Sequence, residues 1–341
     1  MKRLDQEHEA RADADFDDVD ADELPGGLPC CLAGLRHDQQ LPAPALNDVD
    51  GVRVADDLPP VFDAHVHVFP PKLFEAIWRW FDVNGWPIRH KLHADDVVAF
   101  LRARGIDGCL LLHYAHKPGI ARAMNRFVVD VAARSGGFAK GTATVCPGEP
   151  DQVAILEEAF ALGLHGIKLH CHVQGVAVDD PRLFPLFELC QDKDEPVIVH
   201  AGREPWSAAL PVDPHAICNV ERTAAVLRAF PRLRVVVPHF GADEFDDYAQ
   251  LMTRHDTLWL DTTMMVGGYF GDTSNDSDSD NVDVDAWARL IVARPERVLY
   301  GSDFPGLPYA WDREIKALTR GLKDPVLEAV LGDNARALFK L

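Results

Sequence analysis

The sequence predicts an α/β protein built on a single (β/α)8 TIM barrel, and three observations support this fold class. From residue 61 onward, short apolar segments alternate with amphipathic segments, a pattern typical of βαβ units that share a parallel sheet. Eight such apolar segments occupy the 243 residues from Val61 to Asp303, close to the roughly 250 residues of a usual barrel. Polar residues recur at the carboxyl ends of these segments, where a barrel assembles its active site.

Each apolar or amphipathic segment predicts one element of the barrel. We expect strands at 61–69, 107–114, 138–146, 164–173, 196–202, 233–241, 257–263 and 297–305. We expect helices at 95–105, 121–136, 152–163 and 181–194, with further helical material between the later strands. A doubly wound open sheet is the alternative, but that fold gathers its chemistry at one switch point instead of on many strands.

The first 59 residues differ in composition from the rest of the chain. They carry 15 acidic and 5 basic side chains, an excess of 10 that supplies half of the formal net charge of −20. The segment has little apolar content before residue 24 and is rich in Pro and Gly after it. We therefore expect an irregular, acidic N-terminal extension over 1–59 and one catalytic domain over 60–341.

The composition also narrows the class of protein and its partners. With 47% hydrophobic and 26% charged residues, the chain is typical of soluble globular proteins. The negative net charge disfavours nucleic acid and anionic membranes as partners, and no apolar run approaches the ~20 residues that span a bilayer. The seven cysteines lack CxxC spacing and the start of the chain lacks an apolar signal segment, so we expect a cytoplasmic location.

The first predicted strand, "VFDAHVHVFP", places two histidines in an apolar run. His65 and His67 are separated by one residue, so in a strand their side chains point to one side and Val66 to the other. A pair of neutral imidazoles at this spacing suits a divalent transition metal. Because HxH is a short pattern, the remaining ligands must come from other strands.

Further polar residues stand at the ends of the later strands. They are Lys168 and His170 on the fourth strand, His200 on the fifth, His239 on the sixth and Asp303 on the eighth. In a barrel these strand ends surround a single mouth, so residues that are distant in sequence meet there. His172 shares a face with Lys168 and His170 by period 2, and Arg203 follows the fifth strand in a loop.

In this order, the HxH pair and the segments "GIKLH", "VIVHAG", "VVVPHFG", "YGSDFP" and "GDNARALFKL" resemble the amidohydrolase superfamily. The resemblance is strongest to the amidohydrolase-related (amidohydrolase 2) branch, which includes metal-dependent hydrolases and decarboxylases, and it covers about residue 60 to the C-terminus. It implies a catalytic metal centre with the ligands His65, His67, His200 and Asp303. It also implies that Asp303 handles protons, and that His239 is an acid or base in mononuclear members or a second-metal ligand in binuclear ones.

Lys168 has three interpretations. In binuclear members a lysine on the fourth strand is carbamylated and bridges two metals, whereas in mononuclear relatives its cation can bind a substrate carboxylate. A lysine paired with an internal carboxylate is the third, because a buried ammonium needs a partner. We favour one metal and an uncarbamylated Lys168, because four ligands already satisfy one ion. We expect zinc, with manganese or cobalt as alternatives.

The predicted function is that of a metal-dependent hydrolase, which uses metal-activated water on an amide, lactone or ester bond of a small, anionic organic acid. Asp303 would be the base, and His239 the acid or oxyanion stabiliser. The alternative is a metal-dependent nonoxidative decarboxylase of the same family, and a more remote one is a non-catalytic barrel that binds a ligand. Association as a homodimer is a further open alternative.

Several loop residues are candidates for contact with substrate. His170 and His172 would bind substrate or hydrogen-bond the metal ligands, and Arg203 would grip a carboxylate or form a surface salt bridge. Trp78, Trp80, Trp86 and Trp206 suggest a mouth that accepts aromatic groups. The acidic loop 271–285 resembles part of a calcium loop, but its composition favours a solvated lid or insertion. The aspartates at the calcium-like spacing are Asp276, Asp278 and Asp280.

Overall fold

The computed structural model describes residues 44–203, 207–210, 212–269 and 284–341. Eight strands form its centre: β1 (Phe62–His67), β2 (Gly108–Leu112), β3 (Ala139–Gly141), β4 (Ile167–His170), β5 (Val197–His200), β6 (Val235–Val237), β7 (Leu258–Asp261) and β8 (Val298–Leu299). They pair in parallel and in chain order, from β1 to β3 and from β4 to β8. Parallel bridges between Ala143 and Ile167 and between Val66 and Phe304 join the two groups at both ends. The closed ring confirms the (β/α)8 barrel and excludes the open sheet.

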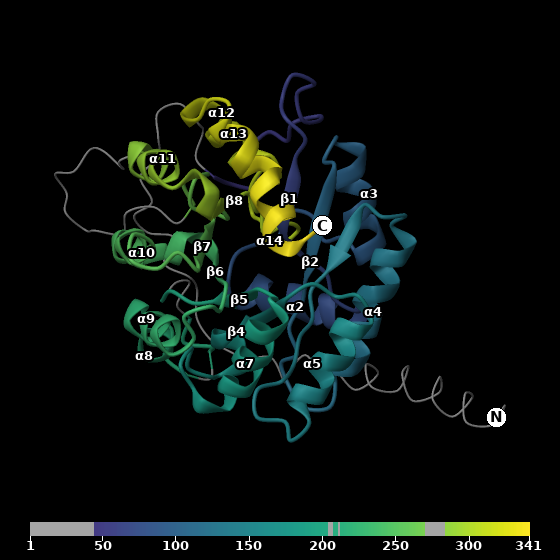
Figure 1. Ribbon diagram of the computed structural model, residues 1–341. Coiled ribbons are helices and arrows are strands. Elements are labelled where there is room, and N and C mark those ends of the chain that lie inside the picture. The colour runs from purple at the N-terminus through teal and green to yellow at the C-terminus, as the bar shows by residue number, and fades with distance from the viewer. Residues whose placement is uncertain (1–43, 204–206, 211, 270–283) are drawn as a thin grey trace.

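Helices surround the ring of strands (Figure 1). They are α2 (Pro71–Asn84), α3 (Ala94–Ala103), α4 (Ala121–Arg134), α5 (Gln152–Ala161), α6 (Cys171–Gln174), α7 (Phe184–Lys193), α8 (Pro214–Ile217), α9 (Val220–Ala229), α10 (Phe245–Met252), α11 (Val284–Ala293), α12 (Arg313–Gly321), α13 (Val326–Glu328) and α14 (Asn334–Phe339). The four helices whose ranges were predicted correspond to α3, α4, α5 and α7, each within three residues at either end. Within the described ranges, no helix has both the length and the apolar character that crossing a membrane would require.

Local sequence signals explain several helix boundaries. At the start of α9, the side chain of Asn219 accepts a hydrogen bond from the backbone N–H of Arg222 at 3.2 Å, which satisfies one of the free donors of the first turn. α2 begins with Pro71, whose fixed backbone angle suits the first helical position. α7 ends at Lys193, and the next residue, Asp194, takes the left-handed conformation that commonly closes a helix.

The strands are shorter than the apolar segments that predicted them, most clearly at β8. The chain leaves β8 after Leu299 and then bonds to β1 instead of continuing the ladder with β7. The backbone N–H of Asp303 donates to the carbonyl of His65 at 2.9 Å, and that of His67 donates to Phe304 at 2.8 Å. These bonds bring Asp303 beside the two histidines of β1.

The inside of the barrel is apolar at one end and polar at the other. Inward-facing side chains of the strands pack with three side chains of α14, which lies across the end of the ring (Figure 1). This plug consists of Phe62, Ala64, Leu110, Leu112, Ile198, Val236, Trp259, Leu299, Ala335, Leu338 and Phe339. Outward-facing residues such as Val197 and Val199 join the larger core beneath the helices. The plug leaves the carboxyl ends of the strands as the place where polar groups gather.

A β-bulge in β1 turns His65 into the barrel. The register of β1 against β2 slips between Asp63 and Val66, so Ala64 and His65 together oppose one residue of β2. Ala64 belongs to the interior plug, and His65 joins the interior polar group. Under strict period-2 alternation these neighbours would point to opposite faces. Bulges are frequent next to active sites, where they re-aim a side chain in this way.

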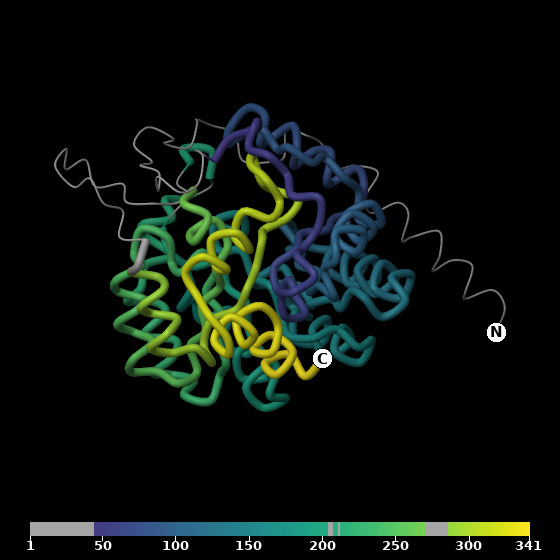
Figure 2. The backbone as a smooth tube through the Cα atoms, turned by 90° about the horizontal axis from the view of Figure 1, so that it is seen from above, coloured from purple at the N-terminus to yellow at the C-terminus, as the bar shows by residue number. Residues whose placement is uncertain are grey.

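Residues 44–59, the last part of the predicted extension, pack on the barrel beside the start of α12 (Figure 2). Asp48 Oδ2 lies 3.0 Å from Arg313 Nη1, and their side chains are 6% and 3% exposed. The indole Nε1 of Trp311 donates to the carbonyl of Gly51 at 2.9 Å. These contacts attach the segment to the barrel, and the earlier part of the extension lies outside the described residues.

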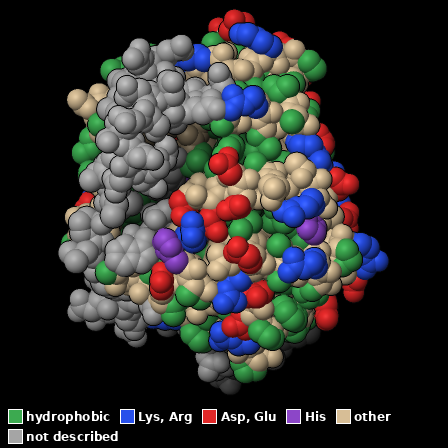
Figure 3. All heavy atoms as spheres, turned by 90° about the vertical axis from the view of Figure 1, so that its left-hand side faces the viewer, with side chains coloured by type: hydrophobic (Ala, Val, Ile, Leu, Met, Phe, Trp, Pro, Cys, Tyr) green, Lys and Arg blue, Asp and Glu red, His purple; other side chains and the backbone are tan. Residues whose placement is uncertain are grey.

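The outer face over α9 and α10 carries intermixed acidic and basic side chains (Figure 3). A surface groove of about 530 Å³ lies between these two helices, lined by Val220, Glu221, Ala224, Arg228, Asp247, Gln250, Leu251, Arg254 and His255. None of the predicted site residues lines this groove. The candidate site is therefore found at the strand ends and not on the helical surface.

Candidate metal centre and active site

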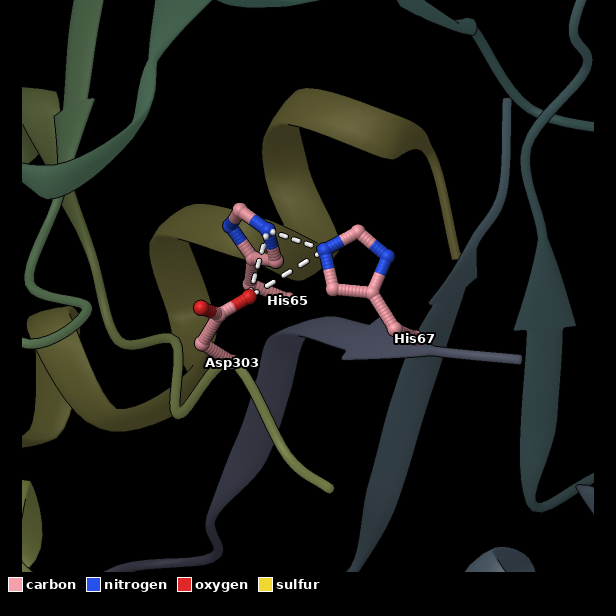
Figure 4. A group of neighbouring side chains, drawn as sticks. All are labelled: His65, His67 and Asp303. Atoms are coloured by element: carbon pink, nitrogen blue, oxygen red, sulfur yellow. Dashed lines mark hydrogen bonds and ion pairs between the residues drawn. The ribbon is translucent and has the colours of Figure 1, made fainter. Parts of the chain in front are cut away.

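Three of the predicted ligands meet at the carboxyl ends of the strands (Figure 4). His65 and His67 come from β1, and Asp303 comes from the loop after β8. The Nε2 atoms of the two histidines are 3.2 Å apart. Asp303 Oδ1 lies 3.4 Å from His65 Nε2 and 3.1 Å from His67 Nε2. Within the described residues, these three side chains form the group whose spacing suits a metal ion.

The chemistry of this group fits a divalent metal. His65 Nδ1 lies 2.7 Å from Asp261 Oδ2, and an ionised carboxylate can only accept, so Nδ1 carries the proton. The lone pair on Nε2 of His65 then faces a second ring nitrogen and a carboxylate oxygen. A tetrahedral ion with bonds of about 2.0–2.2 Å holds its ligands about 3.3–3.6 Å apart, close to the observed spacing. Two imidazoles and a carboxylate suit zinc, manganese or cobalt.

Asp303 is held in an uncommon backbone conformation that presents its carboxylate to the histidines. Its φ is 67°, in the left-handed region that non-glycine residues seldom adopt. Burial acts to raise the pKa of the carboxyl group, but the hydrogen bond from His67 and the nearby His65 and His239 lower it below its usual range. The side chain is therefore ionised and can ligate a cation.

His239 follows β6 in a turn of consecutive left-handed residues. Its own φ is 58°, and the turn depends on Gly241, where a Cβ would lie 2.0 Å from the ring of Tyr248. The backbone N–H of His239 donates to Asp261 Oδ1 at 2.9 Å, and its Nδ1 lies 2.7 Å from Thr263 Oγ1. Burial lowers the pKa of the imidazole, so the ring is uncharged at neutral pH.

Asp261, the last residue of β7, is a site residue that sequence reasoning missed. One of its carboxylate oxygens contacts His65 and the other contacts His239, so it joins two of the predicted residues. Burial acts to raise its pKa, but the charge and hydrogen bond of His65 lower it to about 2. The available signal was an acidic residue at the carboxyl end of an apolar strand, in "LWLD", as on the other strands.

His200 is not part of the group formed by His65, His67 and Asp303, and packs instead against three other histidines. Its ring stacks on His170 with centroids 4.2 Å apart and planes 9° apart. Its centroid is 4.5 Å from that of His172 and 4.9 Å from that of His239. Its Nε2 is buried and has no hydrogen-bond partner among the described residues. The assignment of His200 as a fourth ligand stays a prediction.

His170 and His172, which are separated by one residue at the end of β4, differ in their surroundings. His172 Nε2 donates to the carbonyl of Gly202 at 3.1 Å, and burial lowers its pKa to about 4. This bond favours a role for His172 in holding the loop after β5. His170 instead packs edge-on against Tyr114, with centroids 4.6 Å apart, and its Nδ1 has no partner among the described residues. Contact of either ring with substrate stays a prediction.

Lys168 is fully buried in the barrel interior on β4. Burial lowers its pKa to about 8, against the raising effect of Asp261 and Asp303. In the described part of the chain, the ammonium has no hydrogen-bond partner, so neither carboxylate pairs with it closely. Because burial of a charged group without a partner is unfavourable, such a residue is a candidate for contact with a ligand.

Arg203, in the loop after β5, is engaged by two acidic side chains. Its Nη2 lies 2.7 Å from Asp243 Oδ2, and its Nε lies 3.6 Å from Glu244 Oε1. The structure thus forms the salt bridge that was the alternative to substrate binding. Burial raises the pKa of Glu244 to about 7, so this ion pair is partly neutralised below that pH. A direct contact between Arg203 and substrate stays a prediction.

Aromatic side chains flank His67 at the mouth. The ring of Phe69 stacks on His67 with centroids 5.9 Å apart, and Tyr114 approaches edge-on at 5.8 Å. Neither aromatic residue was predicted as part of the site. Trp86 is buried and donates to the carbonyl of Gly306 at 2.7 Å, so it supports the loop that carries Asp303. Trp206 and the loop aspartates Asp276, Asp278 and Asp280 lie outside the described residues.

Solved structures with the same architecture include two bacterial proteins. One is an uncharacterised TIM-barrel protein, Bb4693 of Bordetella bronchiseptica, which is 20% identical with a TM-score of 0.61. The match covers 82% of this chain and 98% of Bb4693. The other is the 5-carboxyvanillate decarboxylase LigW of Sphingomonas paucimobilis, which is 17% identical with a TM-score of 0.59. The match covers 83% of this chain and 99% of LigW. At these identities the likeness shows the fold.

Comparison with curated proteins finds a shorter match of higher identity. The 2-amino-3-carboxymuconate-6-semialdehyde decarboxylase of Dictyostelium discoideum is 34% identical over 92 residues. The match covers 24% of this chain and 25% of that protein, so it spans about a quarter of the relative's length.

The family model described as amidohydrolase (Amidohydro_2) matches residues 62–341. The match begins at the first residue of β1 and runs to the end of the chain, as the motif resemblance predicted. The histidines and the aspartate that converge in Figure 4 lie within it. The chain therefore belongs to the amidohydrolase family and is an enzyme of that family.

Proposed function

We propose that this enzyme is a metal-dependent, nonoxidative decarboxylase of a small carboxylic acid with an unsaturated or aromatic carbon framework. The observation that carries the proposal is the 34% identity to a decarboxylase of an unsaturated semialdehyde acid. The fold of LigW, a decarboxylase of an aromatic acid, supports the same reading. Hydrolysis of an amide, lactone or ester is the second candidate, because both reactions use the same metal ligands.

The proposed metal ligands are His65, His67 and Asp303, with His200 as the fourth. When bound, the ion supplies a Lewis acid that draws electron density from a substrate oxygen. Burial lowers the pKa of His65 to about 4 and also lowers that of His200, so both imidazoles are available as neutral ligands.

The remaining roles fall to residues around the proposed metal. The buried ammonium of Lys168 would hold a substrate carboxylate, since it has no hydrogen-bond partner in the described residues. Phe69 and Tyr114 would pack on the carbon framework and exclude water. As the carbon–carboxylate bond breaks, its electron pair stays on the carbon. The uncharged His239 would take up a proton from solvent at Nε2 and deliver it to that carbon in place of the departing CO₂.

The test is to assay a preparation purified without chelators against two panels of compounds. Aromatic and unsaturated acids would be assayed for CO₂ release, and lactones and amides for hydrolysis. We expect CO₂ release that stops after chelator treatment and returns with zinc, manganese or cobalt. In D₂O, the product should carry one deuterium at the carbon that lost the carboxylate. Hydrolysis without CO₂ release would overturn the proposal and establish the second candidate.

A pair of histidine variants tests the proton donor. His239→Asn should reduce turnover by about 10²–10⁴-fold while the protein keeps its metal, since a positioned acid contributes that much. The matched control is His255→Asn, in the surface groove outside the barrel, which should retain activity. Equal activity of His239→Asn and the control would contradict the assigned role.

Elemental analysis decides between one metal and two. We expect about one equivalent per chain in both the wild type and Lys168→Ala, since one ion needs about four ligands. About two equivalents in the wild type, falling in Lys168→Ala, would mean that a carbamylated Lys168 bridges two ions. That result would also make His239 a ligand and favour hydrolysis.

A further inference from the structure

Both carboxylate oxygens of Asp261 are committed to groups of the site. Oδ2 lies 2.7 Å from His65 Nδ1. Oδ1 accepts three donors: the hydroxyl of Thr263 at 2.5 Å, the backbone N–H of His239 at 2.9 Å and that of Thr263 at 3.2 Å. The side chain is 3% exposed, so these bonds are not in competition with bulk water.

The hydroxyl of Thr263 transmits the effect of Asp261 to the ring of His239. Its single proton is used in the bond to Asp261 Oδ1, so its oxygen can only accept from His239 Nδ1, which lies 2.7 Å away. The carbonyl of Thr263 lies 3.2 Å from the same nitrogen and also only accepts. His239 therefore carries its proton on Nδ1, as His65 does.

We propose that Asp261 is a positioning residue that fixes the tautomers of two histidines with different tasks. Through Oδ2 it directs the lone pair of His65 Nε2 toward the metal group. Through Oδ1 and Thr263 it orients His239 for proton transfer. One buried carboxylate thus couples metal binding to the placement of the acid. The role in proton transfer rests on the proposed function, whereas the role in metal binding does not.

The two roles of Asp261, through Oδ2 on metal binding and through Oδ1 on His239, can be tested separately. An amide has one oxygen that accepts and one nitrogen that donates, so it cannot replace both carboxylate oxygens. In Asp261→Asn, the three donors at Oδ1 require the amide oxygen there, which places the NH₂ group at His65 Nδ1. An NH₂ group donates, so His65 must then carry its proton on Nε2, facing His67 and Asp303. This variant should lose metal affinity while the contacts of Thr263 with His239 remain.

Thr263→Val tests the other role, because it removes the contact between Asp261 Oδ1 and the ring of His239. Valine matches threonine in shape but removes the hydroxyl between Asp261 and His239, leaving the bond from Asp261 to His65 in place. This variant should keep its metal affinity and lose turnover, because the ring of His239 is less well held.

The experiment measures zinc affinity by competition with a chromophoric chelator at pH 7. We expect Asp261→Asn to bind zinc about 10–100-fold more weakly and Thr263→Val to stay within about threefold of the wild type. The control, Glu314→Gln, changes a fully buried carboxyl that accepts from Tyr309 and contacts no histidine of the site, and it should bind zinc like the wild type. Unchanged affinity in Asp261→Asn, or equal losses in Asp261→Asn and Thr263→Val, would overturn the proposal.

Two further measurements distinguish positioning from a general structural effect. Nitrogen-15 NMR of the histidine-labelled, metal-free protein should show the proton of His65 moving from Nδ1 to Nε2 in Asp261→Asn, while His239 is unchanged. The kcat of zinc-saturated Thr263→Val should fall about tenfold with little change in KM. If no substrate of the proposed class is turned over, the affinity and NMR results still test the role in metal binding, so the two failures are distinguishable.

Discussion

Replacing Lys168 with Met should stabilise the metal-free protein at neutral pH. The pKa of this lysine falls from 10.5 to about 8 because the ammonium is fully buried. At about 1.4 kcal/mol per pKa unit, this lowering corresponds to a destabilisation of about 3 kcal/mol at pH 7. Met has a similar length and no charge, so the substitution removes this cost without opening a large cavity.

The gain should depend on pH in a defined direction. The folded protein releases the proton near pH 8 and the unfolded chain near pH 10.5, so the wild type gains stability as the pH rises between these values. Above about pH 10.5 the lysine is neutral in both states, and the difference between the two proteins should vanish. Urea unfolding of chelator-treated protein at pH 7, 9 and 10.5 measures the free energy of unfolding directly.

Lys316→Met is the matched control, because Lys316 is partly exposed and paired with Asp312 at 3.0 Å. It should change the free energy of unfolding by less than about 1 kcal/mol at each pH. A Lys168→Met protein that is less stable than the wild type at pH 7 would refute the reasoning. A difference that does not change with pH would refute it as well, since the cost would then not come from the charge.

Two other predictions concern buried ionisable groups. Asp48→Ala removes the carboxylate that lies 3.0 Å from the buried guanidinium of Arg313 and should lower the free energy of unfolding by about 3–5 kcal/mol, whereas Arg53→Ala, in an exposed pair, should change it by less than about 1 kcal/mol. Similar urea midpoints for the two variants would contradict this. Burial raises the pKa of Glu314 from 4.5 to about 8, so the wild type should lose stability as the pH rises through this range, and Glu314→Gln should lose less. Parallel pH profiles of the two proteins would show that Glu314 is ionised in the fold.

The barrel and most of its polar residues were predictable because their signals are local and repeated. Strand and helix alternation survives in the sequence as hydrophobic periodicity, and the carboxyl ends of parallel strands must meet at one mouth. These two rules bring His65, His67 and Asp303 together without any knowledge of contacts. The same rules apply to Asp261 at the end of "LWLD", so the sequence carries a signal for this residue as well.

The remaining features depend on contacts between segments that are distant in the chain. In a barrel both faces of each strand are buried, so period-2 alternation cannot tell the inside from the outside. In β1 the neighbours Ala64 and His65 both face inward, because a bulge adds one residue to the strand. The engagement of Arg203 by Asp243 and the absence of a close partner for Lys168 in the described residues likewise depend on how separate elements pack. The order of the residues along the chain carries the fold and the donor set, whereas the tautomers, the charges and the pairing of those donors arise only when the strands close into a ring.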